Sequence, residues 1–278
     1  MYQDFVLPLT GTAGDDDAMA AALALARHFQ ARLTVLELVN LPMPTANPWG
    51  LMPDIAMGEA YSRLRAQGEA NAGRLRTRLA DSGADCEVRV VEALFSDPPR
   101  QAARSSHHAD LLVVAGPSND GAEGSIAQGF AAALLLESGR PVLVVPPGAP
   151  LRGADAGVLL AWRQGAEAAR ALHDSLPLLR AASRGDLVAV DLPAGDEARS
   201  VLDEVATHLA RHGVHARVEV VESRGRAVAA VLTEHALDMA AGLIVAGGYG
   251  HSLLCEWVIG GVTRELLLGS PVPVLFSH

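Results

Sequence analysis

The sequence contains no lysine, and all 22 of its basic residues are arginine. A Walker A phosphate loop and a Schiff-base mechanism each require a lysine, so both are excluded. Only two cysteines are present, Cys86 and Cys255, and they do not lie at a metal-binding spacing. We expect two buried thiols rather than a disulfide or a catalytic pair.

Clustered positive charge and long apolar runs are also absent. The net charge is -10 at pH 7 and the arginines are scattered, which argues against a nucleic-acid partner. No run is apolar and long enough to span a bilayer, and the N-terminus lacks a basic region followed by an apolar one. We therefore expect a cytoplasmic protein without membrane contact.

The chain repeats itself. Residues 79–93, LADSGADCEVRVVEA, align without a gap on residues 209–223, LARHGVHARVEVVES, with seven of fifteen positions identical. Segments further along correspond in the same way, 110–116 to 242–248 and 140–146 to 272–278. The repeat predicts two copies of one structural unit.

We place the two domains at residues 1–147 and 155–278, with an insert at about 40–57 in the first. The insert contains four prolines, so we expect it to lack regular structure. A linker, 146–156, separates the copies.

Short runs rich in Val and Leu alternate with longer amphipathic segments in each copy. Continuously apolar strands separated by helices predict a parallel sheet covered on both faces, so the fold class is α/β with two doubly wound, five-stranded sheets. In the second copy we expect strands at 157–162, 186–192, 216–222, 242–247 and 272–276, and helices near 164–183, 196–212, 225–240 and 261–268.

Glycines gather directly after the fourth strand of the second copy, in GGYGHSLLCEWVIGGVTREL, residues 247–266. Ligands of doubly wound sheets bind beyond the carboxyl ends of the strands. Glycine lets backbone amides approach a ligand, and a helix N-terminus supplies free N–H groups. This stretch therefore predicts a phosphate site, although glycines after a strand also serve tight turns.

The spacing of these glycines resembles that of the universal stress protein family. The family carries Gly, two residues, Gly, nine residues and then Gly followed by Ser or Thr, after the fourth strand of an adenine-nucleotide-binding fold. Gly247, Gly250 and Gly260 fit this spacing. The resemblance covers both copies, so the chain is similar to a tandem universal stress protein with Rossmann-like, adenine nucleotide alpha-hydrolase-like domains.

The resemblance implies that Gly247 and Gly250 border the ribose and the α-phosphate of ATP or AMP, with Mg²⁺ if the ligand is ATP. The outer phosphates would be held by four residues, Gly260, Gly261, Val262 and Thr263.

Two departures weaken the match. Gly261 stands where ATP-binding members have Ser or Thr, and Arg163 replaces the usual acidic residue after the first strand. The alternative that the chain binds no cofactor therefore stays open.

The first copy departs further. Gly116 matches the first glycine, but Asn119 occupies the place of the second, and residues from Gly124 onward do not fit the nine-residue spacing. Thr10 replaces the acidic residue after the first strand. We expect this copy to bind nucleotide poorly or not at all.

Other reactive side chains give weaker signals. His208 and His212 lie one helical turn apart and could hold a metal, but no further ligand has a supporting spacing, so we expect solvated histidines and no metal site. The run Asp15, Asp16 and Asp17 is interpreted as a solvated first helical turn. Ser252 follows its strand too distantly for a nucleophile elbow, which argues against a serine hydrolase.

These patterns favour a non-catalytic regulatory stress-response protein that binds an adenine nucleotide in its second copy. Two alternatives stay open, a nucleotide-free interaction scaffold and a weak ATP-hydrolysing enzyme. Single-copy relatives pair through their last strands, so we expect 140–146 and 272–276 to form an intramolecular pseudo-dimer. A homodimer of the whole chain and the identity of protein partners also stay open.

Overall fold

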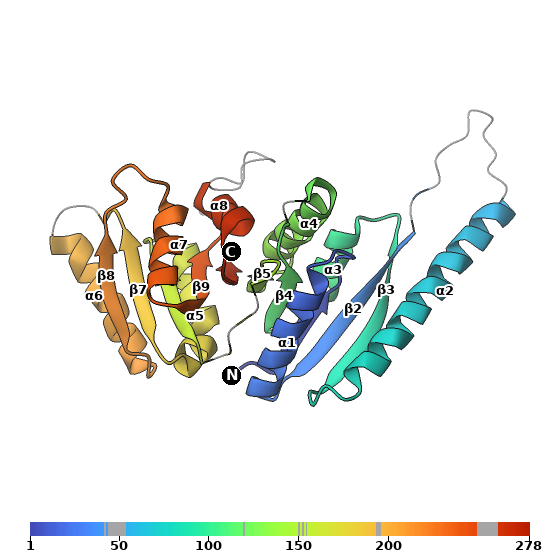
Figure 1. The fold of residues 1–278 in the computed structure, drawn as a ribbon, viewed down its shortest axis with the longest axis horizontal. Coiled ribbons are helices and arrows are strands. Elements are labelled where there is room, and N and C mark those ends of the chain that lie inside the picture. The colour runs from blue at the N-terminus through green and yellow to red at the C-terminus, as the bar shows by residue number, and fades with distance from the viewer. Residues whose placement is uncertain are drawn as a thin grey trace.

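The computed structural model describes residues 1–41, 43, 54–118, 120–149, 151, 153, 155–192, 196–248 and 261–278. Within these residues strands and helices alternate along the chain (Figure 1). The strands are β1 (Asp4–Pro8), β2 (Arg32–Leu41), β3 (Cys86–Leu94), β4 (Leu111–Ala115), β5 (Val142–Val145), β6 (Gly157–Ala161), β7 (Gly185–Val190), β8 (Ala216–Val221), β9 (Ala241–Gly247) and β10 (Val274–Ser277). The helices are α1 (Asp15–Phe29), α2 (Asp54–Leu79), α3 (Pro98–Ser105), α4 (Gly121–Glu137), α5 (Ala166–Ala181), α6 (Asp196–Arg211), α7 (Val228–Asp238) and α8 (Gly261–Gly269).

All ten strands form one sheet, in the order β3-β2-β1-β4-β5-β10-β9-β6-β7-β8. Strands within each copy are parallel, whereas β5 and β10 pair antiparallel, with Leu143 opposite Leu275. The two copies are therefore related by a pseudo-twofold axis at this junction. This arrangement confirms the predicted fold class and the predicted pairing of the last strands.

Each face of the sheet is covered by helices of both copies. Helices α1, α2, α5 and α6 pack on one face, and α3, α4, α7 and α8 on the other. Alternate residues of one strand serve the two faces, as Phe5 and Leu7 lie in the first cluster and Val6 in the second. This burial on both sides explains why the strands are apolar throughout.

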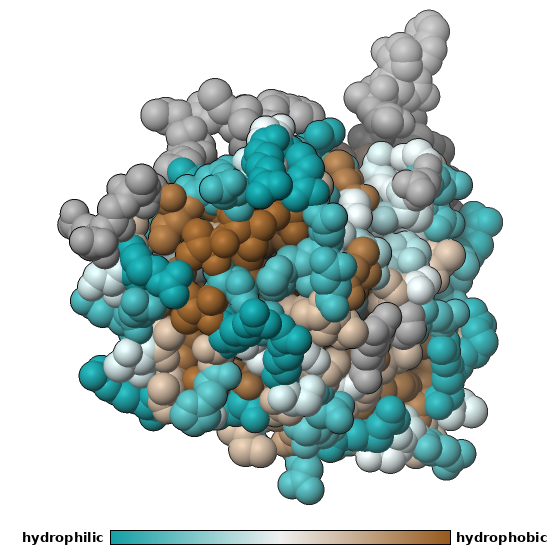
Figure 2. Space-filling view, turned by 60° about the vertical axis from the view of Figure 1, so that its left-hand side comes forward, coloured by the Kyte–Doolittle hydropathy of each residue, from teal (hydrophilic) through white to brown (hydrophobic). Residues whose placement is uncertain are grey.

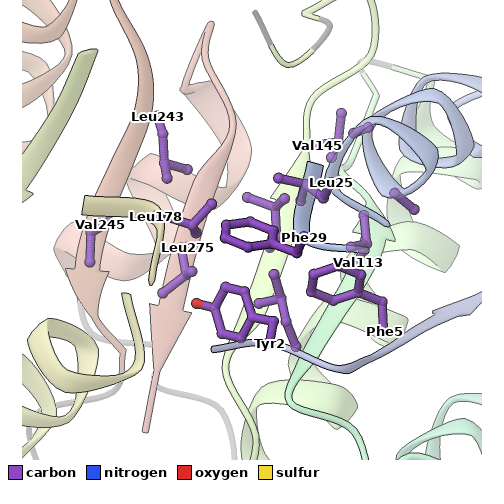
Figure 3. Close-up of a cluster of buried hydrophobic side chains, with 14 of the residues drawn as sticks. Tyr2, Phe5, Leu25, Phe29, Val113, Val145, Leu178, Leu243, Val245 and Leu275 are labelled. Atoms are coloured by element: carbon purple, nitrogen blue, oxygen red, sulfur yellow. The ribbon is translucent and has the colours of Figure 1, made fainter. Parts of the chain in front are cut away.

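One core cluster runs across the junction between the copies. The ring of Tyr2 packs edge to face against Phe5 and Phe29, with centroids 5.5 and 5.3 Å away. Figure 3 shows the rings of Tyr2 and Phe29 on the side facing Leu178 and Leu275 of the second copy. The Tyr2 hydroxyl also donates a hydrogen bond to the backbone oxygen of Asp174 in α5.

The insert of the first copy is more regular than expected at its ends. Strand β2 continues through Leu41, which pairs with Leu94 of β3, and α2 already begins at Asp54. The expectation that all of 40–57 lacks regular structure is therefore wrong. All four prolines fall between Leu41 and Asp54, which leaves the strand end and the helix start free of them.

Two smaller expectations have mixed outcomes. Cys86 is half-buried rather than buried, and Cys255 lies outside the described residues. Gly213, after α6, has a positive φ of 79°, as glycines that end helices commonly do. None of the helices in the described part of the chain is long and apolar enough to cross a membrane.

Candidate functional site

The predicted site lies at the carboxyl edge of the second copy's strands. Gly247 is the last residue of β9, and α8 begins at Gly261. The motif glycines Gly250 and Gly260 fall in 249–260, outside the described residues. The structure therefore describes four of the six predicted site residues, namely Gly247, Gly261, Val262 and Thr263.

Gly247 packs tightly against the first turn of α5. A Cβ built on this glycine would lie 2.8 Å from the backbone nitrogen of Ala168 and 2.8 Å from the carbonyl carbon of Glu167. Real Cβ atoms do not approach backbone atoms this closely. The close packing of β9 on α5 thus requires a glycine here, whatever else the residue does.

The first turn of α8 contains residues in three different surroundings. A Cβ on Gly261 would meet none of the described residues within 4 Å, so no packing contact with them requires this glycine. Val262 is half-buried against the α7 and α8 face of the core. Thr263 is only 6% exposed and lines a small cavity with Leu135 and Phe276, at the seam between the copies.

In the first copy, the strand end and the helix start also approach each other closely, but the glycine lies at the helix start and not at the strand end. Ala115 pairs with Val145 as Gly247 pairs with Ser277, so Ala115 is the counterpart of Gly247. A Cβ on Gly14, beside the start of α1, would lie 3.1 Å from the Cβ of Ala115. In the first copy the helix end therefore supplies the glycine that the strand supplies in the second.

This register corrects the interpretation of Gly116. Its N–H donates to the oxygen of Val145 at 2.7 Å, as the N–H of Gly248 donates to Ser277 at 2.8 Å. Gly116 is therefore the counterpart of Gly248 and not of Gly247. The repeat of 110–116 in 242–248 already pairs these two glycines, and only the motif spacing assigned Gly116 to the first motif position.

The connection after β4 is much shorter than that after β9. Only residues 116–120 join β4 to α4, and α4 has 17 residues against nine in α8. Gly124 lies so close to this turn that a Cβ on it would be 2.4 Å from the oxygen of Ser118. In the first copy, additional turns of α4 thus stand in place of the glycine-rich sequence 247–260 of the second copy.

Carboxylates of the chain itself bind the backbone N–H groups at this edge of the first copy. Asp120 accepts from Ala122 and Glu123 at 3.0 and 3.3 Å, which caps the N-terminus of α4. Glu123 in turn accepts from the N–H of Ala13 at 3.1 Å. These N–H groups are the ones that a bound phosphate would otherwise use.

Asp15 makes the same kind of contact, and so the solvated turn expected at Asp15–Asp17 is wrong for this residue. Its carboxylate accepts from the N–H of Thr10 at 3.0 Å, the hydroxyl of Thr10 at 2.7 Å and the N–H of Gly11 at 2.8 Å. Burial raises the pKa of Asp15, and these hydrogen bonds oppose the increase. The backbone N–H groups of Thr10 and Gly11, in the turn between β1 and α1, are thereby bound to the Asp15 carboxylate.

Half-buried apolar side chains line the carboxyl edge of the second copy. Three of them are the last residues of the adjacent strands β6, β7 and β8, and two lie in the first turns of α7 and α8. Figure 2 shows hydrophobic side chains gathered in patches between polar ones on one side of the molecule. The half-buried apolar residues at the carboxyl edge of the second copy are Ala161, Val190, Val221, Val228 and Val262.

Two polar residues border this edge. Arg163 follows β6 and is exposed. Asp191 follows β7 and has a φ of 51°. Hydrogen bonds from the side chain of Ser223 and from its N–H, the latter at 2.7 Å, lower the pKa of Asp191. Asp191 was not predicted, because the expected strand 186–192 includes it, whereas β7 ends at Val190.

The structure also corrects the expectation of solvated histidines on α6. The Nε2 atom of His208 is buried and has no hydrogen-bond partner within the described residues. His208 packs against His212 and against His173 of α5. Across the part of the chain that the structure describes, no group of three or more His, Cys, Asp or Glu side chains is arranged to hold a metal ion.

Comparison with known proteins yields matches over the whole chain. A sequence model described as the Universal stress protein family matches residues 1–146 and 155–278. No curated protein matches the chain.

Solved structures share the fold. A universal stress protein from Archaeoglobus fulgidus DSM 4304 is 17% identical, with a TM-score of 0.74 over 99% of this chain and 97% of that one. A functionally unknown protein from Pseudomonas aeruginosa PAO1 is 13% identical, with a TM-score of 0.65 over 99% and 92%. A universal stress protein in complex with cAMP is 21% identical, with a TM-score of 0.34 over 52% and 97%. At these identities the solved structures show the fold alone.

Proposed function

Because this chain belongs to the universal stress protein family, we propose that it is a regulatory stress-response protein whose second copy binds an adenine nucleotide, ATP or AMP. The proposal takes 1–147 and 155–278 as the two domains and assigns no nucleotide to the first. Catalysis is not part of it.

The contrast between the two carboxyl edges carries the proposal. In the first copy, Asp15, Asp120 and Glu123 already bind the backbone N–H groups that a phosphate would need. In the second copy, the first turn of α8 contains no acidic residue, and a Cβ on Gly261 would meet none of the described residues within 4 Å. A helix N-terminus without a carboxylate in its first turn favours an anion.

Each part of a nucleotide has a chemical counterpart at this edge. The glycines Gly247, Gly250 and Gly260 and the first turn of α8 would hold the phosphates through backbone N–H groups. The half-buried valines at the ends of β7 and β8 would lie against the base. Mg²⁺, if ATP is the ligand, would be held chiefly by phosphate oxygens and water, since the described residues offer no metal cluster.

Calorimetric titration of the nucleotide-stripped chain with ATP, ADP, AMP and cAMP, with and without Mg²⁺, tests the proposal. We expect one site per chain. The decisive variant is Gly261→Asp, whose carboxylate would repel the phosphates while still suiting a helix N-terminus. Gly261→Asn has nearly the same shape without the charge and is the matched control.

Loss of binding in Gly261→Asp but not in Gly261→Asn would support a phosphate at the start of α8. Two sites per chain would contradict the inactive first copy. Binding of none of the four nucleotides would favour the interaction scaffold. Release of inorganic phosphate from ATP above the level of the Gly261→Asp variant would favour the weak hydrolase.

A further inference from the structure

Three histidines of the second copy form one cluster between α5 and α6. His173 lies on α5, His208 lies on α6, and His212 directly follows α6. The ring centroids are 4.6 Å apart for His208 and His212, 5.1 Å for His173 and His208, and 6.3 Å for His173 and His212. The rings meet edge to face, and the contacts of His173 with His208 and His212 join α5 to the C-terminal end of α6.

The hydrogen bonds of His212 require an unprotonated ring nitrogen. Arg180 of α5 donates to the backbone oxygen of His212 at 2.7 Å and lies 3.2 Å from its Nδ1. An arginine side chain only donates hydrogen bonds and keeps its charge, so Nδ1 must act as the acceptor. A proton on Nδ1 would remove this bond and place two positive charges side by side.

His208 is also unfavourable to protonate. Burial lowers its pKa, and the neighbouring His212, His173 and Arg211 lower it further. Its Nε2 atom has no partner among the described residues that could accept a hydrogen bond from an added proton.

Few carboxylates of the described residues lie near the three histidines. Asp174 lies beside His173 on α5, but it also interacts with Arg170 and Arg140. Glu204 lies one turn before His208 on α6 and is exposed. The cluster thus combines three histidines with Arg180 and Arg211, and positive charge prevails there at acid pH.

The first copy has the same helix contact without the histidines. Arg27 donates to the backbone oxygen of Ser82 at 2.9 Å, as Arg180 donates to that of His212. The repeat pairs His208 with Arg78, which forms an ion pair with Asp16 at 2.7 Å. His173 corresponds to Ala20.

We propose that this histidine cluster is an acid-sensitive contact. Mild acidification weakens the contact between α5 and α6 in the second copy and leaves the corresponding contact between α1 and α2 in the first copy intact. When α5 and α6 separate, the histidines can take up protons that they cannot accept while the helices are in contact. The contact is therefore stable at neutral pH and is lost as the pH falls through the histidine range. Helix α5 also packs against Gly247, so the loosening would reach the carboxyl edge of β9.

Amide hydrogen exchange of the full chain at about pH 7.5 and about pH 5.5, corrected for the intrinsic exchange rate, tests this proposal in the histidine range. A metal chelator in both buffers keeps stray ions off the imidazoles. We expect protection in α5 and α6 to fall by roughly tenfold per pH unit for each proton taken up on opening. Protection in α1 and α2 should change much less.

The key variant is His212→Asn, whose amide oxygen can accept from Arg180 at any pH. It should keep the protection at neutral pH and lose part of the acid response. His208→Gln is the second variant, and His215→Gln, an exposed histidine nearby, is the control that should behave like the wild type. An acid response that is unchanged in both variants, or one that is equally large in α1 and α2, would overturn the proposal.

Discussion

Replacing Gly247 by alanine tests whether packing alone requires this motif glycine. The new Cβ would lie 2.8 Å from two backbone atoms of α5, at Glu167 and Ala168. Carbon atoms attract one another best at about 3.5 Å or more, so α5 must move away by about 0.7 Å. Backbone atoms cannot rotate out of the way, and overpacking of this kind costs about 1–3 kcal/mol. We expect the free energy of unfolding to fall by about 2 kcal/mol, the middle of that range.

Urea unfolding of the nucleotide-free chain, followed by circular dichroism, measures this loss. Gly261→Ala is the matched control, because a Cβ there meets none of the described residues within 4 Å and neither glycine has a positive φ. We expect the control to be as stable as the wild type, or more stable by about 0.5 kcal/mol. If Gly247→Ala proves as stable as Gly261→Ala, the packing argument is wrong and a ligand is the better reason for the glycine.

Three further changes have defined outcomes. Gly261→Ser should strengthen ATP binding by roughly tenfold over Gly261→Ala in calorimetry, because a hydroxyl bond to a charged phosphate contributes about 1.5 kcal/mol; equal affinities would count against a phosphate there. Burial tends to raise the pKa of Asp186, but the hydrogen bonds from Arg184 and His235 prevail and lower it, so this carboxylate stabilises the fold above the ordinary aspartate pKa and ceases to do so as the pH falls through its folded value. Asp186→Asn should therefore cost about 2 kcal/mol in urea unfolding at neutral pH, and that deficit should shrink in acid; a deficit independent of pH would contradict the ion pair. Tyr2→Phe should cost about 1 kcal/mol in the same assay, since it removes only the hydroxyl bond to α5, and an unchanged stability would mean that this bond does not matter.

The fold could be predicted closely because its signals are local. The expected strand at 242–247 is β9, Ala241–Gly247, and the expected helix at 261–268 is α8, Gly261–Gly269. Both are marked by a period or a continuous run of apolar residues, and burial on two faces gives such runs little freedom to vary. The repeat then transferred the same order of elements to the first copy.

The chemistry of the carboxyl edges could not be predicted, because it depends on contacts between distant residues. Nothing near Gly247 in the sequence shows that Glu167 and Ala168 approach it, and nothing near Gly14 points to Ala115. These partners are set by how each helix lies on the sheet. The motif therefore located the candidate site without showing which of its glycines the packing already requires.

The same reason explains the errors at charged side chains. An aspartate at the start of a helix is usually solvated, but Asp15 is half-buried and accepts hydrogen bonds from Thr10 and Gly11 in the turn before α1. His208 is likewise covered only because His173 comes from another helix. Each outcome depends on a neighbour that local sequence does not identify.

The antiparallel pairing of β5 with β10 changes what a single substitution can do. When two identical chains pair through their last strands, every change in one site is imposed on both. Here the partner edge belongs to the same chain, so each site can vary alone while the pairing is preserved, and dilution cannot separate the halves. In the first copy, carboxylates can therefore occupy the backbone N–H groups at the carboxyl edge, while β5 still pairs with β10 of the second copy.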